Sequence, residues 1–142
     1  MSDTLATGPG DTKIVEAAKG VWEKAKGKPY TWNGHTTNGF DCSGFTMYVL
    51  KQAYPSLGLD FMTAGSIFAS PHFIPVTGTP EAGDLICFRK GPEVPYDHVG
   101  IVYDTTHWIG SQTSTGVALV SFNDFFWSKK PHFFIRLVKA IS

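Results

Sequence analysis

Residues 39–45 read Gly-Phe-Asp-Cys-Ser-Gly-Phe, and they put a cysteine where a polar, glycine-containing loop runs into a helix. The helix is predicted to begin at about Cys42 and to stop before Pro55, with a buried face marked by Phe45, Tyr48, Val49 and Ala53. A thiol at a helix start feels the positive end of the helix dipole and the first-turn N–H groups, which favour the nucleophilic thiolate. The same N–H groups are suited to hold an oxyanion. Cys42 is therefore a candidate nucleophile, with a packed, unreactive core thiol as the alternative.

The segments around this motif predict helices first and strands afterwards. A helix is expected over residues 12–25, capped by Asp11 or Thr12, and a short third helix over residues 61–69. Strand-like periodicity then covers residues 85–90, 98–103, 107–113, 117–122 and 133–138. Helices followed by an antiparallel meander indicate an α+β fold, with residues 1–10 as a loose N-terminal arm and residues 11–142 as a single domain.

A histidine opens one of these strands, because residues 97–103 read Asp-His-Val-Gly-Ile-Val-Tyr. Alternation along the strand puts Val99 and Ile101 on one face and His98 on the other. A histidine at a strand end, beside a glycine that leaves space, is well placed to meet a thiol from a helix start. His98 is therefore the candidate general base, with a hydrogen-bonded core histidine as the alternative.

Composition excludes several other classes of function. The 12 basic and 12 acidic residues leave no net charge and no cationic run, so neither a nucleic acid nor a membrane surface is an expected partner. No apolar run approaches the ~20 residues of a membrane-spanning helix. No histidine pair has metal-ligand spacing with a cysteine or carboxylate, and Cys87 is expected to be a core thiol within a strand. Neither a metal nor an organic cofactor is expected.

Four segments together resemble the NlpC-type family of cell-wall cysteine peptidases: Pro-Tyr-Thr-Trp-Asn-Gly at 29–34, the motif at 39–45, Ala-Gly-Asp-Leu at 82–85 and Asp-His-Val-Gly-Ile at 97–101. Their order and spacing match the family across roughly residues 12–138. The resemblance implies a papain-like α+β fold, in which N-terminal helices pack on a five- to six-stranded antiparallel sheet and the nucleophile stands at a helix N-terminus. It also implies hydrolysis of amide bonds in peptidoglycan stem peptides, often the bond between D-glutamate and a diamino acid.

The resemblance also assigns roles to individual residues. Carried over position by position, Cys42 corresponds to the nucleophile and His98 to the base. Tyr30, Asp41 and Ser43 correspond to substrate-binding residues beside the nucleophile.

Two positions depart from the family pattern. Asn33 replaces the first of two glycines after the tryptophan, and an ungapped match puts Gly110 where the family has a third polar residue, usually histidine. Glycine has no side chain to orient an imidazole. With a three-residue turn after its strand, His98 would instead face Gln112, whose amide oxygen can accept the imidazole N–H. Gln112 is the preferred third residue, and Ser111, a backbone carbonyl or a water molecule are the alternatives.

Other functions remain open at this point. The same Cys–His pair suits an acyltransferase or a deamidase, which only the products distinguish. A non-catalytic wall-binding module is favoured by Gly110 alone, and rapid alkylation of Cys42 by iodoacetamide at mildly acidic pH would argue against it. A purely structural domain is disfavoured by the position of Cys42 at a loop–helix junction.

The start of the chain does not read as a secretory signal peptide. A compact wall hydrolase without a leader suits an antibacterial effector delivered into rival bacteria, and it also suits a phage lysis enzyme or a domain of a larger protein. For a delivered effector we expect a monomer that acts in the periplasm of the target cell after secretion by a signal-independent route. An immunity protein is then the expected protein partner.

Overall fold

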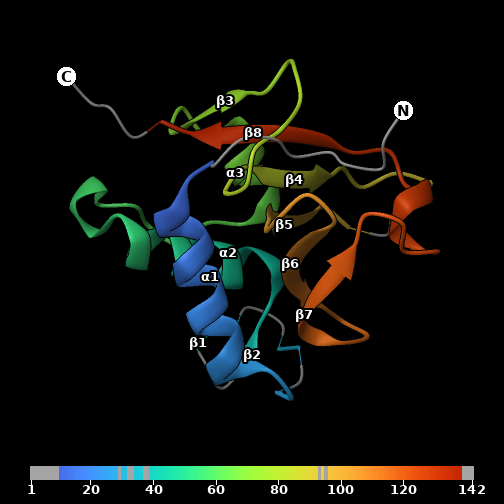
Figure 1. The fold of residues 1–142 in the computed structure, drawn as a ribbon, viewed down its shortest axis with the longest axis horizontal. Coiled ribbons are helices and arrows are strands. Elements are labelled where there is room, and N and C mark those ends of the chain that lie inside the picture. Colours follow the sequence, from blue (N-terminus) through green and yellow to red (C-terminus); the bar gives the residue numbers. More distant parts are fainter. Residues whose placement is uncertain are drawn as a thin grey trace.

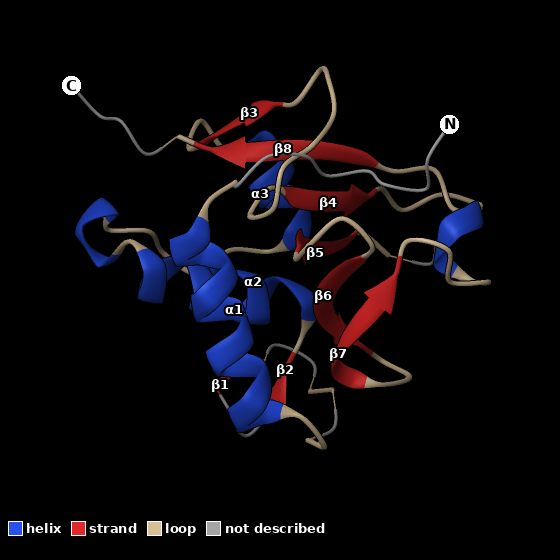
Figure 2. Ribbon diagram, viewed as in Figure 1, coloured by secondary structure: helices blue, strands red, loops and turns tan. Residues whose placement is uncertain are grey.

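The computed structural model describes residues 10–28, 30–31, 34–36, 39–92, 94 and 96–138. Its elements are α1 (Thr12–Ala25), β1 (His35–Thr36), β2 (Gly39–Phe40), α2 (Cys42–Ala53), η1 (Pro55–Leu57), α3 (Ala64–Ala69), β3 (Phe73–Pro75), β4 (Leu85–Phe88), β5 (His98–Val102), β6 (His107–Gln112), β7 (Gly116–Ser121), η2 (Trp127–Lys129) and β8 (Phe133–Leu137). Helices α1 and α2 lie together on one side of a curved sheet (Figure 1). The short turn η2 lies at the opposite side of the molecule (Figure 2). Only Gly10 of the expected N-terminal arm is described, so the arm stays a prediction.

Side-chain caps decide where the helices begin. The N–H of Ile14 donates to Asp11 Oδ1 over 3.0 Å, and the N–H of Gly44 donates to Asp41 Oδ1 over 2.6 Å, so α1 and α2 begin as predicted. Helix α3 begins three residues later than expected, because Thr63 accepts a hydrogen bond from the Ser66 N–H and caps the helix there. The Asp41 cap makes Cys42 the first residue of α2.

The main sheet is antiparallel, with the strand order β3-β8-β4-β5-β6-β7, and β1 and β2 form a separate hairpin. Strands β4 to β8 are the five predicted strands, and their ends agree with the prediction within two residues. Strand β3 was not predicted; it has three residues and pairs with β8 at the sheet edge. Its last residue is Pro75, which has no N–H to donate and is therefore tolerated only at an edge.

The sheet buries apolar side chains on both of its faces. Val99 and Ile101 of β5 pack with the helices in the larger cluster. Phe88 and Trp108 belong to a second cluster on the opposite face, and Trp127 of η2 packs against it. The alternation along β5 therefore sends the His98 ring to the aromatic face of the sheet, away from the helix layer.

A buried ion pair ties β4 to β8. Arg136 Nε donates to Asp84 Oδ1 over 2.7 Å, and Arg136 Nη2 donates to Asp84 Oδ2 over 2.9 Å. The N–H of Glu81 also donates to this carboxylate, whose side chain is 3% exposed. Asp84 belongs to the motif at 82–85 and directly precedes β4, the strand that pairs with β5. Its contact with Arg136 on β8 therefore gives it a structural role.

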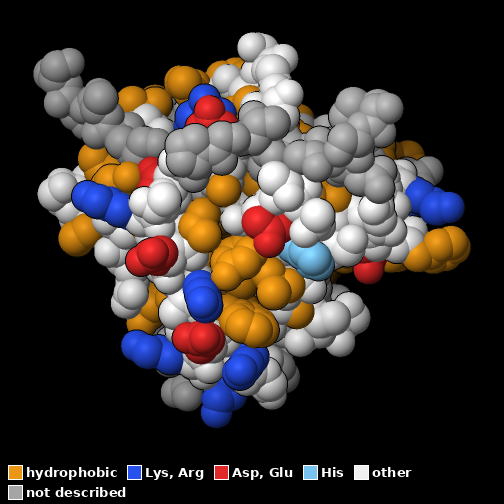
Figure 3. Space-filling view, viewed as in Figure 1, with side chains coloured by type: hydrophobic (Ala, Val, Ile, Leu, Met, Phe, Trp, Pro, Cys, Tyr) orange, Lys and Arg blue, Asp and Glu red, His pale blue; other side chains and the backbone are white. Residues whose placement is uncertain are grey.

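The surface shows no segregation of charge on the face that carries α1. Basic and acidic side chains alternate around a group of hydrophobic ones in the middle of this face (Figure 3), which agrees with the zero net charge of the chain. Within the described residues, no helix has the length and apolar character that a membrane span requires.

Candidate active site

Cys42 stands at the start of α2, where its thiol touches the backbone on both sides of His98. Its Sγ lies 3.8 Å from the carbonyl oxygen of Asp97, and the N–H of Val99 points at the sulfur. The residue is 5% exposed. The fold therefore brings the start of α2 against the start of β5, although Cys42 and His98 are 56 positions apart in sequence. A helix-terminal cysteine can pair with a strand-end histidine only if these two ends meet.

Electrostatics keep this thiol neutral in the resting site. Burial raises the pKa of Cys42 to about 12, although hydrogen bonds from the N–H groups of Val99, Ser43 and Cys42 lower it. The negative charge of Asp41 adds to the effect of burial. The thiolate-favouring effect expected from the helix start is present but is outweighed by desolvation. Burial thereby shifts the thiol toward its neutral form.

The two ring nitrogens of His98 differ in their hydrogen bonding. Its Nε2 lies 3.3 Å from Gln112 Oε1, while its Nδ1 is buried and has no hydrogen-bond partner among the described residues. The Gln112 amide is oriented in turn, because its Nε2 donates to Thr115 Oγ1 and that hydroxyl donates to the carbonyl oxygen of Gly116. An amide oxygen only accepts, so the imidazole proton sits on Nε2 and the lone pair is on Nδ1.

Aromatic side chains enclose the same ring. Trp127 stacks on it with centroids 4.6 Å apart and an interplanar angle of 19°, and Trp108 and Phe88 lie 5.9 Å away. His98 is fully buried, and burial lowers its pKa from 6.5 to about 4, against a smaller opposite effect of the Gln112 hydrogen bond. Its low pKa favours the neutral imidazole at physiological pH.

This burial predicts an acid-tolerant pH profile. If His98 acts as the expected base, its protonation removes the proton acceptor, so kcat/KM for amide hydrolysis should fall to half at about pH 4 rather than at the 6.5 of an ordinary histidine. Circular dichroism over the same range serves as the control for acid unfolding. Trp127→Ala, which uncovers the ring, should move the midpoint toward 6.5, whereas Trp127→Phe should keep it low. A wild-type midpoint near 6.5 would contradict the enclosure of His98.

The register of β5 and β6 explains why Gln112 meets His98. Ile101 pairs with Ile109, and continuing this pairing along both strands sets Gln112 opposite His98 and Gly110 opposite Gly100. Gly110 thus lies two pairs farther along the strands than His98 and does not face the imidazole. Ser111 points to the other face, where it donates to the carbonyl oxygen of Phe40 over 2.8 Å, so it holds β2 rather than the imidazole.

The glycine at position 110 leaves room for the Gln112 amide, which a side chain there would displace. A Cβ at position 110 would stand 2.7 Å from Gln112 Oε1 and 3.1 Å from the Trp108 ring. Gly110→Ala should therefore push the amide off His98 and lower kcat/KM by roughly ten- to a hundredfold. The matched control is Gly20→Ala in α1, where a Cβ meets nothing within 4 Å, and which should raise stability by about 0.5–1 kcal/mol without slowing the enzyme. Equal activity of both variants would exclude an orienting role for the Gln112 amide.

The thiol opens into a cleft of about 210 Å³. The residues that line it come from four segments: Tyr30, Asp41, Cys42, Ser43, Thr63, Ala64, Gly65, Tyr96 and Asp97. All three expected substrate-side residues, Tyr30, Asp41 and Ser43, thus border the nucleophile. Asp41 also serves as the α2 cap and accepts a hydrogen bond from the Ser43 hydroxyl, and burial raises the pKa of Tyr30.

Several residues of this site had no signal in the sequence. Trp127 lies in the long connection between the predicted strands at 117–122 and 133–138, and Tyr96 lies in the connection before His98. Thr63, Ala64 and Gly65 reach the cleft because α3 begins there. The run of three aromatic residues at 125–127, in a connection without strand or helix periodicity, was the available signal for Trp127.

Comparison with known proteins gives a consistent result. The family model described as "NlpC/P60 family" matches residues 27–136. The "Probable peptidoglycan endopeptidase LytE" of Bacillus subtilis is 36% identical over 122 residues, which cover 84% of this chain and 32% of that protein. The "Probable endopeptidase NlpC" of Escherichia coli is 32% identical over 108 residues, which cover 72% of this chain and 65% of that protein. The chain thus spans less than two thirds of the length of either relative.

Solved structures agree with these relatives. The NlpC/p60 domain of the peptidoglycan hydrolase SagA has a TM-score of 0.61 and 30% identity, with 89% of this chain and 97% of that chain covered. An NlpC/P60 family protein from Bacillus cereus has a TM-score of 0.66 with 95% and 42% covered, and at 23% identity it supports the fold alone. The expected papain-like α+β fold is confirmed.

Proposed function

Because the chain belongs to the NlpC/P60 family, we propose that it is a cysteine peptidase that hydrolyses amide bonds in peptidoglycan stem peptides. Cys42 is the proposed nucleophile, His98 the base and Gln112 the residue that orients the imidazole. The observation that carries the proposal is the open Nδ1 of His98, which is buried beside the backbone that the Cys42 thiol touches. An unpaired buried ring nitrogen is costly in a purely structural site, so it argues for a proton acceptor.

The proposed reaction begins from two neutral groups. Binding of a substrate brings its amide carbonyl to Cys42, and the thiol proton moves to His98 Nδ1 as the sulfur attacks the carbonyl carbon. The N–H groups of Cys42 and Ser43, which point at the sulfur in the resting site, are suited to hold the resulting oxyanion. The imidazolium keeps its Nε2 bond to Gln112 and gives the Nδ1 proton to the leaving amine. Water then hydrolyses the thioester with His98 as base.

Tyr30, Asp41 and Ser43 are the proposed substrate-binding residues, because they border the cleft beside the nucleophile. Tyr30→Ala should lower kcat/KM about tenfold through lost contacts, while the melting temperature changes little because the Tyr30 loop lies at the surface of the cleft. Tyr30→Phe keeps the ring and tests the hydroxyl. Peptide kinetics and thermal unfolding on the same samples check this, and a larger loss of stability than of rate would make Tyr30 a residue of the core.

Rival reactions are separated by their products. A peptidase converts a synthetic stem peptide into one fragment with a new carboxylate and one with a new amine. An acyltransferase transfers the acyl fragment to an added amine such as glycine amide, and a deamidase releases ammonia without cutting the chain. A wall-binding module co-sediments with peptidoglycan and gives no product. Mass spectrometry of one reaction mixture containing glycine amide distinguishes all four outcomes.

The biological role proposed here is that of a delivered antibacterial effector, with a phage lysis enzyme as the alternative. The cleft at Cys42 has a volume of about 210 Å³, which suits a partner that inserts a loop, and this supports an immunity protein that plugs the cleft. For this role we expect action in the periplasm of the target cell and a monomeric toxin. A pull-down from the producing strain with Cys42→Ala as bait should recover the immunity protein, and recovery of no partner would count against the effector role.

A further inference from the structure

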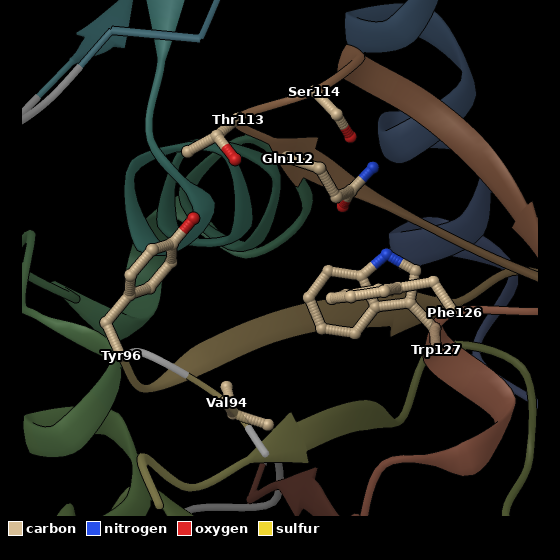
Figure 4. Close-up of a pocket in the computed structure, with 7 residues that line it drawn as sticks. All are labelled: Val94, Tyr96, Gln112, Thr113, Ser114, Phe126 and Trp127. Carbon is tan, nitrogen blue, oxygen red and sulfur yellow. The ribbon is translucent and has the colours of Figure 1, made fainter. Parts of the chain in front are cut away.

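A cavity of about 240 Å³ adjoins the cleft at Cys42 on its imidazole side, since Tyr96 lines both. Across this cavity Tyr96 faces Trp127, which stacks on the ring of His98 (Figure 4). The base of a cysteine peptidase hands its proton to the leaving amine, so the leaving part of the substrate lies on this side. The acyl part must therefore extend from Cys42 in the other direction.

The cleft continues in that other direction. Asp41, Ser43 and Thr63 line both the cleft and a further cavity of about 190 Å³. Among the described residues, this further cavity has no lining residue in common with the cavity at Trp127. It shares Phe61 with a larger cavity of about 440 Å³. These two cavities form a groove that continues the cleft away from the imidazole, and we call it the Phe61 groove.

Helix α2 forms one wall of the Phe61 groove. Gly44 lines the nearer cavity, and Tyr48, Lys51 and Gln52 line the farther one. These four positions follow one another at the spacing i, i+4, i+7 and i+8, so they lie on one face of the helix. Phe61, in the segment between η1 and α3, forms another wall. The groove therefore runs along α2, from its start at the nucleophile to its last turn.

We infer that the Phe61 groove binds the N-acetylmuramic acid residue to which a stem peptide is attached, so that the enzyme acts on sugar-linked stem peptides. The inference rests on the proposed function. When the bond after γ-D-Glu is cut, that residue, one alanine and a lactyl group connect the scissile carbonyl to the sugar, and extended they span on the order of 12 Å. Tyr48 and Gln52 follow Cys42 on α2 by six and ten residues, a rise of about 9 Å and about 15 Å. The sugar therefore reaches the farther cavity, beside Phe61.

The lining of the farther cavity suits a sugar ring. Phe61 is 41% exposed and offers an apolar surface to the C–H face of a pyranose. The Lys51 ammonium lies 5.3 Å from the centre of that ring, and the Gln52 amide and Tyr48 hydroxyl add donors and acceptors for sugar hydroxyl and N-acetyl groups. The cavity volume falls within the roughly 300–1,000 Å³ of sites for small ligands. Among the described lining residues of the groove, only Asp41 and Lys51 carry a charge, and their opposite signs suit an uncharged ligand.

The test compares two peptides that both lack a free N-terminal amine, N-acetylmuramyl–L-Ala–γ-D-Glu–L-Lys and N-acetyl–L-Ala–γ-D-Glu–L-Lys. Wild type should cleave the muramyl peptide with a kcat/KM about tenfold higher, the scale of one added aromatic contact. Phe61→Ala should bring this ratio toward one, and Phe61→Trp should keep it. Gln52→Ala, at an exposed position of α2, should lower the ratio without a folding defect. Phe125→Ala is the matched control, because Phe125 is 82% exposed and lines none of these cavities, and its ratio should equal that of wild type.

Calorimetric binding of N-acetylmuramyl–L-Ala–D-Glu and N-acetyl–L-Ala–D-Glu to Cys42→Ala separates this inference from the proposed function. Tighter binding of the muramyl ligand supports the inference even if no peptide is cleaved, an outcome that would instead count against the hydrolase. Cleavage at equal rates, with no preference in binding, would overturn the inference and leave the hydrolase intact. A muramyl preference that both Phe61→Ala and Gln52→Ala keep would place the sugar elsewhere and overturn it. Faster cleavage of the peptide with a free N-terminal alanine than of the muramyl peptide would also overturn it, since the binding site would then end at Asp41.

Discussion

Cys42→Ala is expected to reduce hydrolysis of a stem peptide by a factor on the order of 10⁴ or more, because it removes the sulfur that forms the acyl intermediate. The fold should tolerate the change. The thiol lies at the wall of the cleft, and its contact with the carbonyl oxygen of Asp97 is a long one of 3.8 Å. We expect the free energy of unfolding to change by no more than about 1 kcal/mol. Steady-state kinetics and denaturant unfolding on the same preparation measure both quantities.

Cys87→Ala is the matched control for this substitution. Cys87 is fully buried in β4 within the larger core cluster and does not line the cleft. Its replacement should lower stability by about 1 kcal/mol or more while kcat/KM stays within a factor of two or so. Substantial turnover by Cys42→Ala, or a comparable loss in both variants, would contradict the assignment of Cys42 as nucleophile.

Arg136→Ala should give the largest loss of stability, about 3 kcal/mol. It leaves the carboxylate of Asp84 buried without its cationic partner, and among the described residues the N–H of Glu81 is then its remaining donor. This expected loss of stability lies at the lower end of the range for buried ion pairs, because the Arg136 side chain is itself one third exposed. Chemical denaturation at pH 7 measures the loss, and the melting temperature should fall by on the order of 10 °C.

Arg136→Lys separates charge from geometry. A lysine restores the positive charge but cannot make the two parallel bonds of the guanidinium, so it should recover only part of the stability. Below its melting temperature, each variant should keep the wild-type pH midpoint, because Asp84 lies outside the cleft. A shifted midpoint would show that this pair acts on His98 and is more than a link between β4 and β8.

Much of the fold was predictable because local signals agreed with the tertiary structure. Aspartates before α1 and α2 cap both helices, and strict alternation identified the strands from β4 to β8. The hairpin between β5 and β6 was predictable in register as well, since a three-residue turn fixes the facing residues on both strands. Strand β3 was missed because three residues at a sheet edge carry too short a pattern, and α3 was placed too early because Thr63 offers a cap only in the folded geometry.

The site was predictable only in part. The contact between His98 and Gln112 follows from strand register, which sequence encodes through turn length. The neutral state of Cys42 was not predictable, because the helix start is local whereas the burial that raises its pKa comes from distant segments. The stacking of Trp127 on His98 depends on how residues 123–131 fold back over the sheet, and no periodicity describes such a loop.

The most direct test of the central claim is mass spectrometry of purified peptidoglycan, from walls of more than one stem-peptide chemistry, digested with wild type and with Cys42→Ala. We predict new muropeptides from the wild-type digest alone, with masses that correspond to hydrolysis of one stem-peptide amide bond. The same products from both proteins would contradict the role of Cys42. No new product from any wall would contradict peptidoglycan hydrolysis itself.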